Sequence, residues 1–142
     1  MKHFLGLLEI LQIIAVSVET KLIDTNFATS NYSFPESERF HKVFQFLIEN
    51  YQHEITLESV ADIAHLSQTA FCRFFKAASN KTLVEVVTDF RINQACSLLI
   101  NTDKPVLEVC FESGFGNISY FNKKFKAITG NTPMEYRKLF VG

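Results

Sequence analysis

The sequence lacks most features that mark special protein classes. It has no Trp and only 3 Cys, 5 Gly and 3 Pro among 142 residues. So little Gly and Pro excludes collagen-like and low-complexity chains, and three widely separated cysteines (Cys72, Cys96 and Cys110) exclude a disulfide-stapled scaffold. Apolar surface is plentiful, since 47% of the residues are hydrophobic and 15 are Phe. This composition predicts one compact globular domain with a short additional segment.

The chain also has no large surplus of charge, because its formal net charge is −1. The charges are nevertheless unevenly distributed. Residues 36–62 carry two cations against six acids, whereas residues 63–142 carry ten cations against six acids. The C-terminal part is therefore electrostatically suited to an anionic partner.

No long uninterrupted apolar run is present. Residues 1–23 are the most apolar stretch, but Glu9 and Gln12 interrupt it, and a membrane span needs about 20 apolar residues with few charges. A signal peptide is an alternative because Lys2 precedes the run, although Glu9 and the unpaired cysteines count against it. We expect instead an apolar helix over 1–23 that packs on another chain or a missing domain, then a linker to residue 35.

From residue 36 onward the apolar pattern is helical. One helix face is marked by Phe40, Val43, Phe44, Leu47, Ile48 and Tyr51. Thr56, Ser67 and Asn117 are suitable N-caps, and Pro105 suits a first helical turn. No segment alternates with period two, so no sheet is expected. The pattern predicts an all-α domain of seven helices, at about 36–51, 56–65, 68–78, 82–100, 105–113, 118–129 and 132–140.

An internal repeat organises these helices. Six residues recur at an offset of 50, since Phe71, Phe75, Lys76, Ala77, Thr82 and Glu85 match Phe121, Phe125, Lys126, Ala127, Thr132 and Glu135. Each copy consists of a short helix, a tight turn and a second helix, which is the helix-turn-helix unit. The repeat predicts helix-turn-helix units at about 56–78 and 105–129, joined by a long helix at about 82–100.

The second helix of each copy has two contrasting faces on a helical wheel. Phe121 and Phe125 lie on an apolar face that we assign to the core. The opposite face is polar and cationic, with Thr69, Cys72, Arg73 and Lys76 in the first copy and Ser119, Asn122, Lys123 and Lys126 in the second. Neither 67–81 nor 117–131 contains an acid, whereas an ordinary solvated helix mixes charges. These faces predict contact with DNA.

Three runs of the sequence carry a family resemblance. They are ADIAHLSQTAFCRFFK (Ala61 to Lys76), RINQACSLL (Arg91 to Leu99) and FESGFGNISYFNKKFKAITGNTPMEYR (Phe111 to Arg137). Together they resemble the AraC/XylS family of bacterial transcription regulators, over about residues 36–140. The resemblance implies a DNA-binding domain at 36–142, homeodomain-like, with two helix-turn-helix subdomains joined by a long central helix. Members usually place a sensor or dimerisation domain first, so residues 1–35 resemble the end of one.

The resemblance also implies which residues read DNA, because in this family the start and exposed face of each second helix contact bases. It assigns base reading to Gln68, Thr69, Cys72 and Arg73 in the first copy and to Ile118, Ser119, Asn122 and Lys123 in the second. We expect phosphate contacts from Ser67, Lys76, Lys81, Asn117 and Lys126. Cys72 and Ile118 would act through apolar contacts, for instance with a thymine methyl group.

Other interpretations of single residues stay open. Lys76 and Lys126 suit plain solvation as well as phosphate contact. His65 occupies the first turn, where a left-handed conformation suits Gly or Asn better. Cys96 and Cys110 have no metal-ligand spacing, so we expect them to pack as small hydrophobes.

The predicted function is sequence-specific binding of double-stranded promoter or operator DNA by a transcription regulator, with two recognition helices in successive major-groove segments. A bridging helix of about 19 residues spans about 28 Å, against about 34 Å between grooves on one face of the duplex. Modest DNA bending or the offsets of the reading helices would supply the difference. The alternative is a helical protein–protein interaction module, whose binding would not depend on salt.

Further expectations concern partners and location. RNA polymerase is the expected protein partner, with self-association through residues 1–23 and no membrane contact. No catalytic residue, metal or cofactor is expected, because no nucleophile is paired with a base and no carboxylates are paired. The unpaired cysteines favour the cytoplasm. As a DNA-binding protein, it is expected to be associated with the nucleoid.

Overall fold

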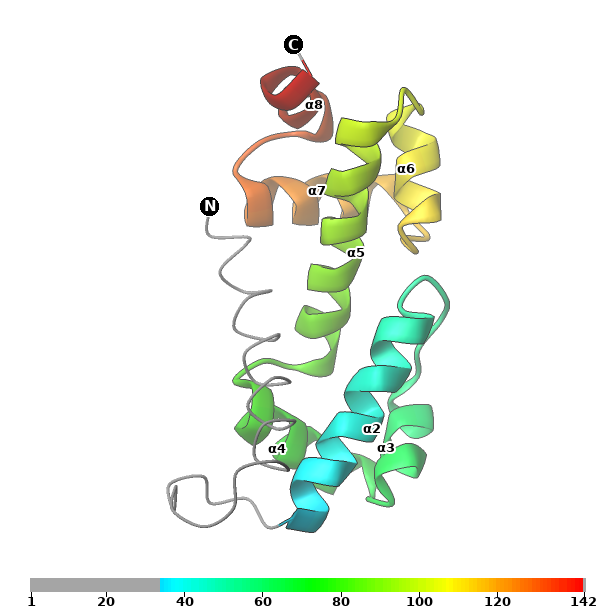
Figure 1. Cartoon of the computed structure of the whole chain (residues 1–142), viewed down its shortest axis with the longest axis vertical. Helices are drawn as coiled ribbons and strands as arrows, with labels where there is room; N and C mark the ends of the chain where they lie inside the picture. Colours follow the sequence, from blue (N-terminus) through cyan, green and yellow to red (C-terminus); the bar gives the residue numbers. More distant parts are fainter. Residues whose placement is uncertain (1–33, 142) are drawn as a thin grey trace. The chain divides into compact units, whose positions relative to one another are not determined.

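The computed structural model describes residues 34–141 of the chain. Within this range it contains seven helices and no strand: α2 (Phe34–Asn50), α3 (Leu57–Ala64), α4 (Gln68–Ser79), α5 (Leu83–Asn101), α6 (Val106–Glu112), α7 (Ile118–Thr129) and α8 (Pro133–Val141) (Figure 1). The all-α prediction and its seven helices are confirmed for this part of the chain. The helix and linker expected over residues 1–33 lie outside the described residues. No helix between residues 34 and 141 is long and apolar enough to cross a membrane.

Two helix boundaries differ from the predictions. α2 begins at Phe34, so the segment assigned to a linker up to residue 35 ends two residues earlier. Pro35 then lies in the first turn of α2, where its missing N–H is no loss. Pro105 directly precedes α6 instead of lying in its first turn, and its ψ of 148° is not helical.

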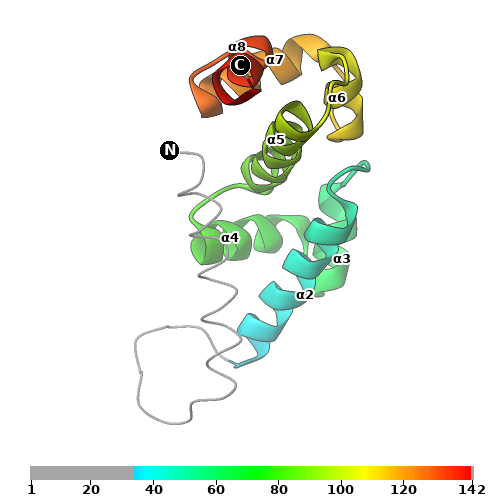
Figure 2. The same ribbon diagram turned by 45° about the horizontal axis from the view of Figure 1, so that its top comes forward.

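The helices divide between two units. The N-terminal unit contains residues 34–49 and Ile55–Leu83, and thus most of α2 with α3 and α4. The C-terminal unit contains Asn50–Glu54 and residues 84–141, and thus most of α5 with α6, α7 and α8. Figure 2 shows α3 followed by α4 in the first unit, and α6 followed by α7 in the second.

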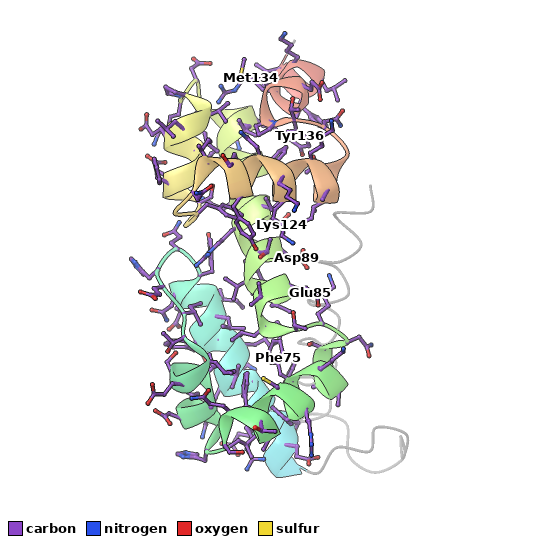
Figure 3. The ribbon with its side chains drawn as sticks, turned by 180° about the vertical axis from the view of Figure 1, so that it is seen from behind. Phe75, Glu85, Asp89, Lys124, Met134 and Tyr136 are labelled. Carbon is purple, nitrogen blue, oxygen red and sulfur yellow. The ribbon has the colours of Figure 1, made fainter. Side chains whose placement is uncertain are left out.

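The core of the N-terminal unit is built from phenylalanines on α2 and α4. The buried residues include Phe40, Val43, Phe44 and Leu47 of α2, Val60, Ala61 and Ala64 of α3, and Phe71 and Phe75 of α4. Phe75 stacks on Phe44 and on Phe71, with ring centroids 5.9 and 5.4 Å away. Figure 3 labels Phe75. The core predicted from the spacing on α2 is therefore confirmed for four of its residues.

Two residues assigned to that α2 face behave differently. Ile48 is 46% exposed. It lies about 80° around the helix from Phe40 at 100° per residue, and so falls at the edge of the apolar stripe. Tyr51 follows the end of α2 and packs its ring against Phe90, with centroids 6.0 Å apart.

The core of the C-terminal unit gathers residues from all four of its helices. Its buried members are Ile92, Ala95, Cys96 and Leu99 of α5, Val109 and Cys110 of α6, Phe115 of the turn after α6, Phe121 and Phe125 of α7, and Tyr136 of α8. Phe125 meets Tyr136 edge to face, with centroids 5.4 Å apart. Figure 3 labels Tyr136 on α8. Cys96 and Cys110 are buried as expected, and burial raises the pKa of Cys96 to about 11.

The turn between the helices of each pair repeats in the backbone. His65 follows α3 with φ 54°, and Gly114 follows α6 with φ 99°. The next residue closes each turn, because Leu66 N donates to Ala61 O at 3.0 Å and Phe115 N donates to Cys110 O at 3.1 Å. The left-handed conformation required of His65 is therefore present.

The ends of α4 and α7 repeat as well. Asn80 and Gly130 adopt positive φ angles of 58° and 83°, and their N–H groups donate to Lys76 O and Lys126 O, both at 2.9 Å. The hydroxyls of Ser79 and Thr129 donate to the carbonyls four residues earlier, at 2.7 and 2.8 Å. The offset-50 sequence repeat is thus a repeat of backbone geometry.

Candidate nucleic-acid interface

Each of the two second helices begins at a side-chain cap. Ser67 Oγ accepts a hydrogen bond from Ala70 N at 3.2 Å, and Asn117 Oδ1 accepts one from Tyr120 N at 2.9 Å. Such caps satisfy N–H groups that have no partner within the helix. The Ser67 hydroxyl and the Asn117 amide NH2 keep their own donors, which suits contact with an anion such as phosphate.

The α4 face predicted to read bases is exposed. Gln68, Thr69, Cys72 and Arg73 are all exposed, as is Lys76 one turn further on. Phe71 and Phe75, on the opposite side, are buried. The helix therefore separates a packed face from a polar face, as the helical wheel predicted.

The α7 face follows the same division with one exception. Ser119, Asn122, Lys123 and Lys126 are exposed. Ile118 is half-buried and packs against the core of the C-terminal unit. The structure thus does not group Ile118 with the exposed residues, because the side chain at the first helical position turns toward the core.

Lys81 also lies apart from the helix faces. It follows the left-handed residue Asn80 and is half-buried, and its N–H donates to Ser79 Oγ at 3.2 Å. Its predicted phosphate contact would therefore come from the turn after α4, not from the helix.

The electrostatics of the two faces are positive. The sequences of α4 and α7 contain no acid. Within residues 34–141, neither Arg73 nor Lys123 forms an ion pair with an acid. Lys104 differs, because its Nζ lies 2.6 Å from Glu112 Oε1 and this hydrogen bond raises the pKa of Lys104. Arg73 and Lys123 are thus available to an anionic ligand, whereas Lys104 is engaged within the chain.

Tyr120 and Lys124 form a feature of α7 that the sequence patterns did not single out. Lys124 Nζ lies 5.6 Å from the centroid of the Tyr120 ring, a cation–π distance. Tyr120 is 40% exposed, and its ring also contacts Phe115. The repeat gave no signal for Tyr120, since Ala70 occupies the matching position of the first copy. Figure 3 labels Lys124.

The described residues offer no metal centre. Between residues 34 and 141, no three His, Cys, Asp or Glu side chains are grouped so that they could hold a metal ion. Cys72, the exposed cysteine, lies among the base-reading candidates of α4.

Two helix pairs with capped second helices and acid-free exposed faces define a tandem helix-turn-helix DNA-binding domain. A family model described as "Helix-turn-helix domain" matches residues 60–139, which is more than half of the chain. Together with the relatives described next, this match shows that the chain belongs to the AraC/XylS family.

Two regulators of Bacillus subtilis illustrate the relationship. The HTH-type transcriptional regulator YdeC is 36% identical over 104 residues, which cover 73% of this chain and 36% of that protein. The bifunctional transcriptional activator/DNA repair enzyme AdaA is 34% identical over 110 residues, which cover 78% of this chain and 52% of that protein. The aligned part thus spans only about a third to a half of these curated relatives.

A solved structure shows the same fold on DNA. The DNA-binding domain of AdpA, described as a global transcriptional factor and solved in complex with a target DNA, has a TM-score of 0.66 and is 26% identical. The match covers 76% of this chain and 94% of that one. The predicted family and fold class are confirmed, and this chain carries an AraC-type DNA-binding domain.

Proposed function

We propose that this chain regulates transcription by sequence-specific binding of double-stranded DNA through α4 and α7. The observation that carries the proposal is the matched pair of exposed, acid-free helix faces, with Arg73 and Lys123 at equivalent positions of the repeat. An Arg or Lys in the major groove donates to guanine O6 and N7, the commonest specific base contact. The AdpA domain, which was solved with its DNA, supports the assignment.

The residue roles follow from position on the two helices. We assign base reading to Gln68, Thr69, Cys72, Arg73, Ser119, Asn122 and Lys123, with Ile118 at the edge of the set. We assign phosphate contacts to Ser67, Lys76, Lys81, Asn117 and Lys126. Base contacts specify the sequence and phosphate contacts fix the register of the protein on the duplex, so the two sets have different effects when substituted.

We propose further that the two helices occupy successive major-groove segments. α5 has 19 residues, and a helix of that length spans about 28 Å at 1.5 Å per residue. Successive major grooves on one face of the duplex are about 34 Å apart, and a modest bend reduces that separation. Two reading helices from one chain would then give a footprint of about two helical turns.

The wider assignments rest on the names of the relatives and on the sequence. AdaA is named a transcriptional activator, which supports activation. We assign RNA polymerase as the protein partner through which activation would occur. Self-association is assigned to residues 1–23, and residues 1–35 to the end of a preceding sensor domain. We assign no catalytic residue, metal or cofactor to this activity, and we assign the protein to the cytoplasm with the nucleoid.

Selection from randomised duplexes, followed by anisotropy titrations at several salt concentrations, tests the proposal. We expect affinity for the selected duplex to fall by about 40-fold or more between 50 and 200 mM salt, because each of the three lysines assigned to phosphate releases counterions on binding. A footprint of about two helical turns would support the two-groove arrangement. Equal affinity for selected and random duplexes would overturn sequence-specific binding. Salt-insensitive binding of a protein partner, without DNA binding, would favour the interaction-module alternative.

A further inference from the structure

The C-terminal unit includes Asn50–Glu54, which are the last residue of α2 and the next four residues, although the rest of α2 and all of α3 belong to the other unit. We call these five residues the connector. Arg91 of α5 binds its backbone twice, since Nε donates to Tyr51 O at 2.7 Å and Nη2 donates to His53 O at 2.9 Å. The Arg91 guanidinium is half-buried, and the loss of solvent lowers its pKa. The connector is therefore fastened to α5 by two charge-assisted hydrogen bonds.

The turn of the second helix-turn-helix unit lies on the same connector. A Cβ at Gly114 would lie 2.8 Å from Tyr51 O, 2.9 Å from Gln52 Cα and 3.0 Å from Arg91 Nε. The Arg91 guanidinium carbon is 5.9 Å from the centroid of the Phe115 ring. Within the C-terminal unit, the connector thus packs against both Arg91 and the Gly114–Phe115 turn.

The first copy of the repeat shows that this turn does not itself require glycine. His65 holds the left-handed position there with φ 54°, and it is exposed. Gly114 occupies the equivalent position, but the connector backbone leaves no room for a side chain. The glycine is therefore explained by the close approach of the connector as well as by its φ of 99°.

We propose that Arg91 and Gly114 are positioning residues that determine how strictly this protein specifies the spacing between its two half-sites. This inference rests on the proposed two-groove function. The chain passes between the units after residue 49, before residue 55 and between residues 83 and 84. While the connector is held, α2 and α3 are tethered to a fixed segment. Once it is released, the same five residues become free linker between the units.

Free linker changes how affinity depends on geometry. A rigid link between the units gives the second reading helix a high effective concentration at its half-site for one half-site spacing and a low one for other spacings. A flexible link gives a lower effective concentration over a wider range of half-site spacings. Releasing the connector is therefore expected to lower affinity at the native spacing and to broaden the range of spacings that bind.

The experiment compares duplexes with the selected half-sites at native spacing and with one or two added base pairs. Each added pair moves a half-site by about 3.4 Å and turns it by about 35°. We expect the wild-type chain to lose about tenfold in affinity per added pair. Arg91→Ala and Gly114→Ala should each lose about tenfold at native spacing and less than about threefold more per added pair.

The chain offers a matched control for each variant. Arg137 donates from Nε to Leu99 O at 3.1 Å and from Nη2 to Lys104 O at 2.7 Å. Arg137→Ala therefore removes a comparable pair of hydrogen bonds to backbone carbonyls and leaves the connector unchanged. Gly130 has φ 83°, but nothing lies within 4 Å of a Cβ placed there. Gly130→Ala therefore adds backbone strain without the close contact. Both controls should keep the wild-type dependence on spacing.

Circular dichroism checks that each variant folds, and amide exchange at residues 51–53 reports release of the connector. Arg91→Lys keeps the positive charge but cannot make both guanidinium hydrogen bonds to the connector, so it tests the inference if Arg91→Ala does not fold. Wild-type spacing dependence in folded Arg91 and Gly114 variants would overturn the inference and leave DNA binding intact. Equal loss of spacing dependence in the controls would overturn it too. Failure of the wild-type chain to prefer the selected duplex would instead overturn the proposed function.

Discussion

His65 and Gly114 occupy the same place in the two helix-turn-helix turns, yet their surroundings differ. His65 is exposed in the left-handed region, whereas Gly114 lies against the backbone of Tyr51 and Gln52. The helix pairs share their caps, their closing hydrogen bonds and their buried phenylalanines. The turn geometry is thus common to both copies, but only the turn of the second copy also packs against the connector.

The exposed faces differ in another way. Cys72 and Arg73 of α4 correspond to Asn122 and Lys123 of α7. Arg and Lys both donate to guanine, but Asn favours adenine, and a thiol offers mainly an apolar contact. The buried phenylalanines match, whereas Cys72 and Arg73 differ from Asn122 and Lys123. We therefore expect the two copies to have the same fold and to read different half-sites.

The largest expected effect tests whether the matching cores are equivalent. Phe75 and Phe125 are buried at equivalent positions. Phe75→Ala and Phe125→Ala should each destabilise the protein by about 3–5 kcal/mol, through lost burial and the cavity that remains. Denaturant titration gives the free energy of unfolding, and amide exchange shows which unit opens. Loss of protection confined to α3 and α4 in both variants would contradict equivalence.

The next effect tests whether the two faces read separate half-sites. Arg73→Ala should relax base preference in one half of the selected duplex and Lys123→Ala in the other, each costing about 1–3 kcal/mol of binding free energy if the contact is to a base edge. Repeating the selection with each variant shows the position that becomes degenerate. If both substitutions relaxed the same half, the two-groove arrangement would be wrong.

The sequence predicted those features of fold and site that depend on neighbouring residues. Ser67 and Asn117 were identified as caps because capping involves only the next three residues, and the exposed faces followed from the helical period. The bond from Arg91 to Tyr51 joins residues 40 apart, and no period relates them. The resemblance groups Ile118 with the base-reading residues, but in the structure Ile118 packs against the core of the C-terminal unit. Contacts with DNA depend on a partner, so no pattern within the chain fixes them.

A smaller effect separates phosphate contacts from base contacts. Lys126→Ala should weaken binding to selected and random duplexes about equally and lower the slope of log affinity against log salt by about one, because one fewer counterion is released. Lys42→Ala is the control, since Lys42 pairs with Glu38 on α2 at 3.3 Å. A change in base preference with Lys126→Ala would assign this lysine to base reading instead.

The smallest effect concerns the start of α8, where the repeat places Thr132 and Glu135 as counterparts of Thr82 and Glu85. Glu135 Oε2 accepts from Thr132 N at 2.8 Å, and Thr132 Oγ1 accepts from Glu135 N at 3.2 Å, which is a capping box. The backbone hydrogen bond from Thr132 lowers the pKa of Glu135. Since the pKa is lower in the folded state, the stabilisation is present above the unfolded value of about 4.3 and is lost as pH falls through the folded value.

Glu135→Gln tests this pH dependence of stability directly. The glutamine side-chain oxygen still accepts the hydrogen bond from Thr132 N, but the amide does not titrate in this pH range. The variant should have a slightly lower Tm than the wild type at pH 7 and a smaller decrease in Tm as pH is lowered below about 4, so that the two proteins converge at low pH. Thr132→Ala removes the hydrogen bond from Glu135 N and should lower Tm at pH 7, 4 and 3. Melting curves at pH 7, 4 and 3 for the three proteins provide the comparison. An identical loss of Tm with pH in the wild type and Glu135→Gln would show that the carboxylate charge of Glu135 does not stabilise the start of α8.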